Sequence, residues 1–349
     1  REELSDEELL PEGREYGKRV SSGGASTTSQ IQEEEESAEE LTSTPTIDSN
    51  SDIFDLHHGD AISIVPAIRD HAADTLNEQA EFVDATITSP PYYDLKEYGS
   101  SKKDEIGQHG SYVEYLQELQ NLFSEVYSVT RDDGSLWVVV NTFRRNREIV
   151  QLPFDIARVC QNLDQGLECS NCENTILRGV EELDSRQTAC PHCGHTTDNN
   201  KSWILQDIVI WNKNRALPYT KEGRLRNVFE YILCFSKNPD FELQMDRIRE
   251  SDPAQFKKWW ADFPERYHPL GKLPENIWEF EPPTRGSFTG EVDVFDHPAA
   301  FPPELIEQIL TLSTESDDIV LDPFAGSGVV LGQSELMDRR PIGVELNKK

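Results

Sequence analysis

The chain has 349 residues and a formal net charge of −32 at pH 7, with 65 Asp and Glu against 33 Lys and Arg. That length suits one large α/β domain or two ordinary ones and is enough to bury a sizeable core. No apolar run approaches the roughly 18 residues of a membrane span, and no secretory pattern opens the chain, so the sequence predicts a cytoplasmic protein without a membrane partner.

The acidic residues are spread along the whole chain, and Arg outnumbers Lys. This diffuse pattern is similar to that of proteins from a high-salt cytoplasm, so we expect a halophilic protein. At such salt concentrations the Debye length falls to about 3 Å, so the negative charge does not by itself exclude a nucleic-acid partner. An ordinary acidic protein that never meets nucleic acid is the alternative.

Secondary structure is expected to begin only after residue 50. Residues 1–50 are rich in Ser, Thr, Gly and Glu and poor in aromatic residues, which predicts a disordered acidic tail. Apolar runs then predict strands at 52–57, 84–89, 135–141, 205–212, 229–237, 318–324 and 341–346. Three- and four-residue apolar spacing predicts helices at 111–129, 151–163, 303–314 and 328–338. The alternation indicates an α/β fold with a mostly parallel, doubly wound sheet, into which 205–212 and 229–237 enter as an antiparallel hairpin.

A glycine-rich turn near the C-terminus has the pattern of a cofactor site. In "IVLDPFAGSGVVLGQSEL" a strand runs into Asp322, Phe324, Gly326 and Gly328 before a helix, and glycines there let a ligand approach the backbone. About 20 residues later Glu345 ends the next strand, where an acidic side chain accepts the hydroxyls of a ribose. The G-x-G spacing favours S-adenosylmethionine over a dinucleotide. A plain strand-to-helix turn is the structural alternative.

A second turn, "TSPPYY" at residues 88–93, follows the strand predicted at 84–89. Ser89 would lie at the carboxyl end of that strand, where open α/β sheets bind ligands. The two prolines stiffen the turn and remove two N–H donors, so the Pro90 carbonyl can point outward, and Tyr92 offers a flat face. These groups suit a planar ligand with an exocyclic amino group, such as a nucleobase. A rigid turn with Tyr92 packed in the core is the alternative.

"TSPPY" followed well downstream by "DPFAGSG" resembles the β-class of amino-group DNA methyltransferases. "HHGDA" (57–61), "RNVFEYILCFSK" (226–237) and "HPAAFPPELIEQIL" (297–310) extend the resemblance over roughly residues 52–347. It implies a Rossmann-like, S-adenosylmethionine-dependent methyltransferase fold with circularly permuted motif order and a mostly parallel seven-stranded sheet. The implied catalytic residues are Ser89, Pro90, Pro91 and Tyr92, and the implied cofactor-binding residues are Asp60, Phe301, Asp322, Phe324, Gly326, Gly328 and Glu345.

The resemblance implies methyl transfer to the exocyclic amino group of a flipped base in a specific sequence of double-stranded DNA. Ser at the first motif position is commoner in enzymes that methylate cytosine N4, so cytosine N4 is favoured over adenine N6. The same motifs are also compatible with methylation of RNA or a small molecule, and with a non-catalytic zinc-bearing DNA-binding protein. The sequence leaves open a partner restriction enzyme, the recognition sequence and the oligomeric state. The chain ends four residues after Glu345, which leaves open whether it is a fragment lacking the family's next helix.

Four cysteines, in "CSNC" and "CPHC", have the spacing of a four-thiolate zinc site. The expected ligands are Cys169, Cys172, Cys190 and Cys193, and a closed shell of four thiolates indicates a structural ion. Cys160 and Cys234 fall in helix and strand patterns and are expected in the core.

The domain organisation follows from these assignments. We expect methyltransferase segments at 51–163, 201–239 and 297–349, with 297–349 binding the cofactor, a zinc-binding insert at 164–200, and a target-recognition region at 240–296. In that last region basic and aromatic residues gather in "RIRESDPAQFKKWW" and "PPTRGSF". The candidate DNA contacts are Arg247, Arg249, Lys257, Lys258 and Arg285.

Overall fold

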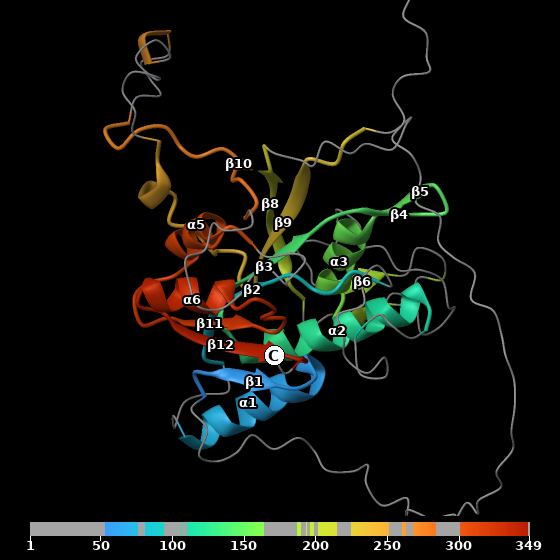
Figure 1. Ribbon diagram of the computed structural model, residues 1–349. Coiled ribbons are helices and arrows are strands. Elements are labelled where there is room, and N and C mark those ends of the chain that lie inside the picture. The colour runs from blue at the N-terminus through green and yellow to red at the C-terminus, as the bar shows by residue number, and fades with distance from the viewer. Residues whose placement is uncertain are drawn as a thin grey trace, which may run out of the picture. The chain divides into compact units, whose positions relative to one another are not determined.

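An eight-stranded sheet lies at the centre of the part of the chain that the computed structural model describes (Figure 1). Its order is β1-β12-β11-β2-β3-β9-β8-β10, and β9 alone in this sheet runs antiparallel to its neighbours. The strands are β1 (Leu56–His58), β2 (Val83–Thr88), β3 (Thr130–Val140), β8 (Ile204–Asn212), β9 (Phe229–Ser236), β10 (Ile277–Glu279), β11 (Ile319–Asp322) and β12 (Arg340–Glu345).

The structure describes residues 53–75, 81–93, 106, 110–163, 187–189, 193, 196–198, 202–214, 225–250, 260–262, 268–283 and 301–347. All of them belong to one unit of the chain, Thr44–Lys349. The tail expected at residues 1–50 lies outside the described residues.

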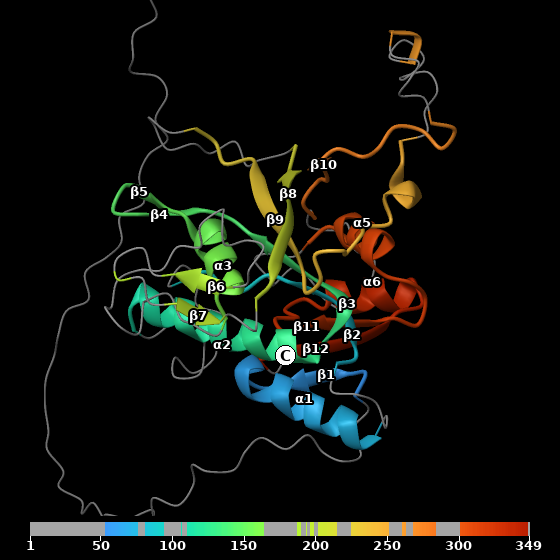
Figure 2. The same cartoon turned by 180° about the vertical axis from the view of Figure 1, so that it is seen from behind.

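Helices cover both faces of the sheet (Figures 1 and 2). One face packs against α1 (Ala61–Thr75), α2 (Tyr112–Val129) and α3 (Leu152–Gln161), and the other against α5 (Pro303–Ser313) and α6 (Val329–Leu336). Along β3, Leu136 and Val138 enter the first core while Trp137 and Val139 enter the second. Because both faces of the strand are buried, its sequence is a continuous apolar run rather than an alternating one.

Short elements of the described residues also lie outside the main sheet. They include two hairpins, β4 (Phe143–Arg145) with β5 (Glu148–Val150), and β6 (Gln187–Ala189) with β7 (Thr196–Asp198). They also include a 3₁₀ turn, η2 (Met245–Ile248).

Local sequence signals explain where several helices begin. Ser111 caps α2, because its side chain accepts a hydrogen bond from the Glu114 amide while the Glu114 side chain accepts one from the Ser111 amide. α5 begins at Pro303, a position where a missing N–H costs nothing. α1 was not expected, because Pro66 interrupts its helical pattern.

The expected fold class is confirmed as a mostly parallel α/β sheet. Strands lie at or near all seven expected positions, although β1 begins at Leu56 rather than at residue 52, and β8 and β9 form the expected antiparallel hairpin, with Ile208 opposite Leu233. The sheet has eight strands rather than seven, because the three-residue strand β10 pairs parallel to β8 at the edge.

The chain connections reverse direction between β2 and β11. From β2 the chain crosses through α2 to β3 on one side, and from β11 it crosses through α6 to β12 on the other, while β2 and β11 pair directly, with Val320 opposite Ala85. Open α/β sheets bind ligands at the carboxyl ends of strands beside such a reversal. The fold therefore points to the turns that follow Thr88 and Asp322.

Candidate functional site

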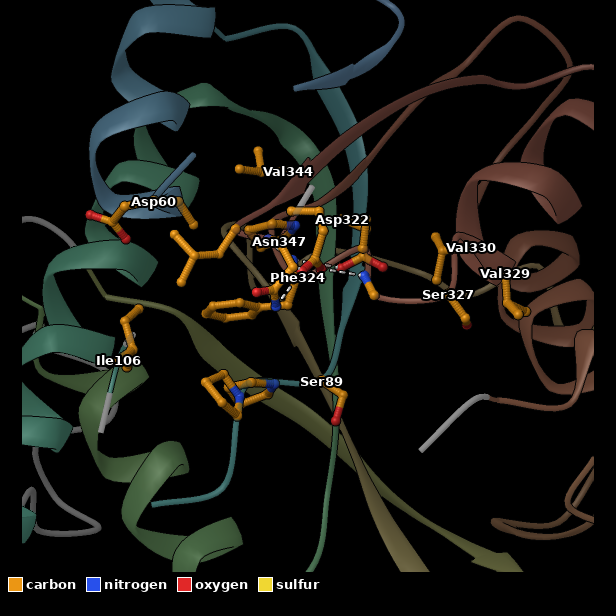
Figure 3. A pocket seen from close by; sticks show the side chains of 18 of the residues that line it. Asp60, Ser89, Ile106, Asp322, Phe324, Ser327, Val329, Val330, Val344 and Asn347 are labelled. Carbon is orange, nitrogen blue, oxygen red and sulfur yellow. Dashed lines mark hydrogen bonds between the residues drawn. The ribbon is translucent and has the colours of Figure 1, made fainter. Parts of the chain in front are cut away.

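A pocket lies where these two turns meet, at the carboxyl ends of β1, β2, β11 and β12 (Figure 3). It is lined by ten of the eleven residues proposed above for catalysis and cofactor binding: Asp60, Ser89, Pro90, Pro91, Tyr92, Phe301, Asp322, Phe324, Gly326 and Glu345. The lining includes further residues that the sequence did not single out, among them Gly59, Ile106, Ser327, Val344 and Asn347. The structure thus gathers residues that are more than 280 positions apart in the chain, from Asp60 to Glu345, around one space.

Gly328, the eleventh residue, does not line the pocket but shapes the turn that leads into α6. It precedes the first residue of α6 in the left-handed conformation, at φ 75°, and its amide donates to the Ala325 carbonyl at 2.7 Å. Gly326 also has a positive φ, 52°. L-residues with side chains rarely adopt these values, so both glycines are needed for the sharp turn between β11 and α6.

Asp322 holds the start of that turn. Its Oδ1 accepts hydrogen bonds from the Phe324 amide at 3.0 Å and from the Thr88 hydroxyl at 2.8 Å. Burial raises the pKa of Asp322 to about 7, and the nearby charge of Glu345 contributes to the rise. The carboxyl group is therefore poised to change its charge near neutral pH.

Glu345 closes the opposite side of the pocket at the end of β12. Its Oε2 accepts a hydrogen bond from the Gly326 amide at 2.9 Å, and its Oε1 accepts from the amide and side chain of Asn347 at 3.0 and 3.2 Å. Since a carboxylate has about four acceptor positions, one position on Oε2 is left for a ligand hydroxyl. Asn347 is a partner of this carboxylate that sequence analysis did not identify.

Asp60 enters the pocket from the loop between β1 and α1. The amide of Gly59 donates to the carbonyl of Glu345 at 3.0 Å, which ties this loop to the end of β12. The Asp60 carboxylate accepts from the Ile62 amide at 3.3 Å at the start of the helix. Asp60 therefore lies just after β1, next to Glu345 at the end of the neighbouring strand β12.

The turn after β2 is anchored from α2. The Tyr115 hydroxyl donates to the Pro91 carbonyl at 2.8 Å, and Tyr92 and Tyr93 pack against the core on the α2 face. The Tyr93 ring centroid lies 5.4 Å from that of Tyr112 and 5.6 Å from that of Tyr115. These contacts fix the backbone that presents Ser89 and Pro90 to the pocket.

The pocket is strongly acidic. Asp60, Asp322 and Glu345 line it, and among the described residues no Lys, Arg or His does. Such a lining favours a cationic ligand and disfavours one that carries phosphate groups.

Of the five basic residues proposed for DNA contact, two lie among the described residues. Arg247 forms an ion pair with Glu315 and donates to the Thr314 carbonyl at 3.0 Å. Arg249 pairs with Asp246 at 2.6 Å and donates to the Gly271 carbonyl at 2.9 Å. These contacts hold η2 and its neighbours together, which gives both arginines a structural role. Lys257, Lys258 and Arg285 lie outside the described residues.

The predicted zinc site falls mostly outside the described residues. Cys169, Cys172 and Cys190 are among the residues not described, and Cys193 is exposed. Within the described part of the chain no group of His, Cys, Asp or Glu has a metal-binding arrangement. The described helices also include none long and apolar enough to cross a membrane. Cys160 and Cys234 are buried in the core, as expected.

The chain is similar to known DNA methyltransferases. The Type II methyltransferase M.Cfr9I of Citrobacter freundii is 26% identical over 298 residues, which cover 84% of this chain and 83% of that protein. The Type II methyltransferase M.SmaI of Serratia marcescens is 26% identical over 273 residues, which cover 77% and 82%. The solved structure of the PvuII DNA methyltransferase, described as cytosine-N4-specific, has the same fold, with a TM-score of 0.51, 17% identity, and 84% and 81% of the two chains covered.

The family model of the N6/N4 DNA methylases matches residues 83–349, a range that contains both the turn after β2 and the glycine-rich turn after β11. The chain therefore belongs to this family of DNA amino-methyltransferases.

Proposed function

We propose that the protein transfers a methyl group from S-adenosylmethionine to the exocyclic amino group of a flipped base in double-stranded DNA, with cytosine N4 as the favoured position. The observation that carries the proposal is the single pocket shared by Ser89 and Pro90 on one side and Gly326 and Glu345 on the other. A methyl donor and an acceptor must meet, and this pocket brings the two candidate binding turns together.

The residues of the pocket fit S-adenosylmethionine. The sulfonium and ammonium groups of this cofactor are cationic, and three carboxyl groups line the pocket. Asp60 would lie near the adenine, Glu345 would accept from the ribose, and Phe301 and Phe324 would supply apolar contacts, with Asp322 and Gly326 facing the rest of the ligand. When bound there, the cofactor supplies a methyl group that its positively charged sulfur makes open to attack by a nitrogen lone pair.

Ser89 and Pro90 would prepare the acceptor. The lone pair of an exocyclic amino group is delocalised into the base ring, so the nitrogen is a poor nucleophile. Hydrogen bonds from the amino group to Ser89 Oγ and to the Pro90 carbonyl would localise the lone pair on the nitrogen. The Tyr115–Pro91 hydrogen bond supports this role, because it fixes the backbone of the turn before a base arrives.

The base has to leave the helix to reach such a pocket, at a cost of about a few kcal/mol of unstacking. Stacking on Tyr92 would offset part of that cost.

The preference for cytosine over adenine rests on Ser89, since adenine-N6 enzymes more often have Asp or Asn at this position. Adenine N6 is the alternative outcome of the test. The order of the motifs, with "TSPPY" before "DPFAGSG", supports a circularly permuted member of the family.

Two parts of the proposal lie outside the pocket. The Type II relatives support a role in restriction and modification, beside a cognate restriction enzyme. A structural zinc ion, held by Cys169, Cys172, Cys190 and Cys193, is supported by the cysteine spacing and by the β6–β7 hairpin. These two strands pair antiparallel on either side of Cys190 and Cys193, as the arms of a zinc-binding turn would.

The substrate class is tested by transfer of a labelled methyl group from S-adenosylmethionine to duplex DNA, structured RNA and free nucleosides. We expect label in duplex DNA, and none with Ser89→Ala, although that variant still binds the cofactor. Label in RNA or nucleosides but not in DNA would overturn the proposal.

A further inference from the structure

The β4–β5 hairpin carries three arginines at the edge of the sheet where the pocket lies, although the chain as a whole is strongly acidic. β4 follows the carboxyl end of β3 after two residues, so the hairpin leaves the sheet at the same edge as the turn that carries Ser89. Both views show it extending outward beside α3 (Figures 1 and 2). Its sequence, "FRRNREIV", has Arg at 144, 145 and 147. We call residues 143–150 the arginine hairpin.

The two faces of the arginine hairpin differ. Phe143 pairs with Val150 and Arg145 with Glu148, so these four side chains share one face, while Arg144 and Ile149 share the other. On the first face the Arg145 guanidinium lies 5.2 Å from the Tyr93 ring centroid, and the Phe143 ring lies 6.4 Å from that of Tyr112. On the second face Arg144 is exposed and Ile149 is 47% exposed, and among the described residues no aromatic ring packs against the Arg144 guanidinium, whereas Arg145 is exposed but contacts Tyr93.

The inner face connects the arginine hairpin to the turn that presents Ser89. Phe143 contacts Tyr112, Tyr112 contacts Tyr93, and Tyr93 directly follows Tyr92 of the pocket. Arg145 adds a direct contact to Tyr93. The position of the hairpin is therefore fixed relative to the pocket by packed aromatic rings.

Arg247 and Arg249 form ion pairs that hold the fold together, and Arg144 and Arg147 differ from them in this respect. Among the described residues no carboxylate forms an ion pair with either, and the Arg144 side chain donates a hydrogen bond to the Arg147 carbonyl at 3.3 Å. Arg147 also has the left-handed φ of 71°, next to Asn146 at 50°, in a two-residue turn where glycine is the favoured second residue. Glycine would fit the left-handed backbone conformation at position 147 better than arginine does.

We propose that the arginine hairpin binds backbone phosphates of double-stranded DNA next to the flipped base, with Arg144 and Arg147 as the contacting side chains. The inference rests on the proposed function, since it takes the occupant of the pocket to be a DNA base. Charge complementarity selects the partner: two exposed guanidinium groups on a rigid finger beside a base-binding turn match the regularly spaced phosphates of a duplex. Arg145 supports the finger through Tyr93.

The test compares two double variants that each remove two positive charges. The first, Arg144→Gln with Arg147→Gly, changes the two proposed contact residues and gives the turn the residue that its geometry favours. The matched control, Arg69→Gln with Arg131→Gln, removes arginines that pair with Glu125 and Asp84 near the opposite, amino-terminal edge of β3. Affinity for a duplex of random sequence is measured from 50 to 200 mM salt, and S-adenosylmethionine binding is measured in parallel.

We expect the hairpin variant to bind duplex DNA about tenfold more weakly at the lowest salt. Its plot of log affinity against log salt should be shallower by about 1.8, because each phosphate contact contributes about 0.9. Cofactor affinity should be unchanged, and the control variant should match the unaltered protein. If the hairpin variant has the same DNA affinity and the same salt slope as the unaltered protein, the assignment of the hairpin is wrong, but the proposed function still stands. If the control variant loses as much DNA affinity as the hairpin variant, the hairpin assignment is also wrong, because the change in net charge would then explain the loss. Failure of the unaltered protein to bind any duplex would overturn the proposed function together with this inference.

Discussion

The Thr88 hydroxyl donates a hydrogen bond to Asp322 Oδ1 at 2.8 Å, between the last residues of β2 and β11. The two residues are 234 positions apart in the chain, and each immediately precedes one of the turns that form the pocket. Both side chains are buried. This bond therefore couples the strand that presents Ser89 to the strand that presents the glycine-rich turn.

Replacing Thr88 by Val should weaken both the fold and the cofactor site. The substitution keeps the shape but leaves Asp322 Oδ1 with the Phe324 amide as its remaining donor. We expect the free energy of unfolding to fall by about 1–2 kcal/mol and the affinity for S-adenosylmethionine to fall with it. Urea unfolding and titration calorimetry measure the two effects.

Thr86 provides the matched control on the same strand. Its hydroxyl is buried and, in the part of the chain that the structure describes, has no hydrogen-bond partner. Thr86→Val should therefore leave the free energy of unfolding unchanged or raise it by up to about 1 kcal/mol. Equal destabilisation by Thr86→Val and Thr88→Val would contradict a specific role for the Thr88–Asp322 bond.

Cofactor affinity should depend on pH through Asp322. Burial raises the pKa of this carboxyl to about 7, so it is mostly protonated at pH 6 and mostly ionised at pH 8. A cationic ligand favours the ionised form, so we expect affinity for S-adenosylmethionine to rise with pH by up to about tenfold across that window. Calorimetry at several pH values measures it. Asp322→Asn should bind more weakly and lose most of the slope; a slope that survives the substitution would assign the titration to another group.

The same raised pKa makes the stability of the ligand-free protein fall as the pH rises, whereas the affinity for the cofactor rises. Because the folded pKa of Asp322 lies above its ordinary value of 3.8, the protonated group favours the folded state, and that contribution is lost as the pH rises toward 7. Bound cofactor should reverse this loss, since it stabilises the ionised carboxylate.

Glu345 should matter for cofactor binding far more than its partner Asn347. Glu345→Gln removes the charge that would accept a ribose hydroxyl, and hydrogen bonds to charged groups are worth about 1.5–3 kcal/mol, so affinity should fall by about 10- to 100-fold. Asn347→Ala leaves the carboxylate and its bond from the Gly326 amide in place, and should change affinity by less than about threefold. Calorimetry with S-adenosylmethionine measures both, and duplex affinity should be unaltered. Equal effects of the two substitutions would argue against Glu345 as the ribose ligand.

The zinc proposal predicts how the six cysteines react with a thiol reagent. Cys160 and Cys234 are fully buried, and burial raises the pKa of both thiols, so neither should react while the protein is folded. If zinc holds the other four, the untreated protein should show almost no fast-reacting thiol. After chelation four thiols should react and about one zinc ion per chain should be released. Four fast thiols before any chelation would contradict the site.

The strands and both pocket turns could be predicted because their signals are local. A run such as "SLWVVV" is apolar on both faces of the sheet, and "DPFAGSG" carries its own turn glycines. The structure places the two turns side by side, since β2 and β11 pair directly.

Other features depend on the folded chain and had no local signal. α1 was missed because Pro66 breaks its pattern, and the β4–β5 hairpin because its turn has Asn146 and Arg147 without a glycine. Thr88 looks like any strand residue until Asp322 is placed beside it. The local composition around Arg247 and Arg249 favours DNA contact, and their ion pairs with Glu315 and Asp246 are visible only in the folded chain.

The central claim, amino-group methylation of a DNA base in the pocket between Ser89 and Glu345, is tested most directly by the identity of the methylated nucleoside. Duplex DNA is incubated with the protein and S-adenosylmethionine, digested to nucleosides and analysed by mass spectrometry. We predict N4-methylcytosine, and none of it when Ser89→Ala replaces the unaltered protein. N6-methyladenine would contradict the base assignment, and a carbon-methylated base or no methylated nucleoside at all would contradict the central claim itself.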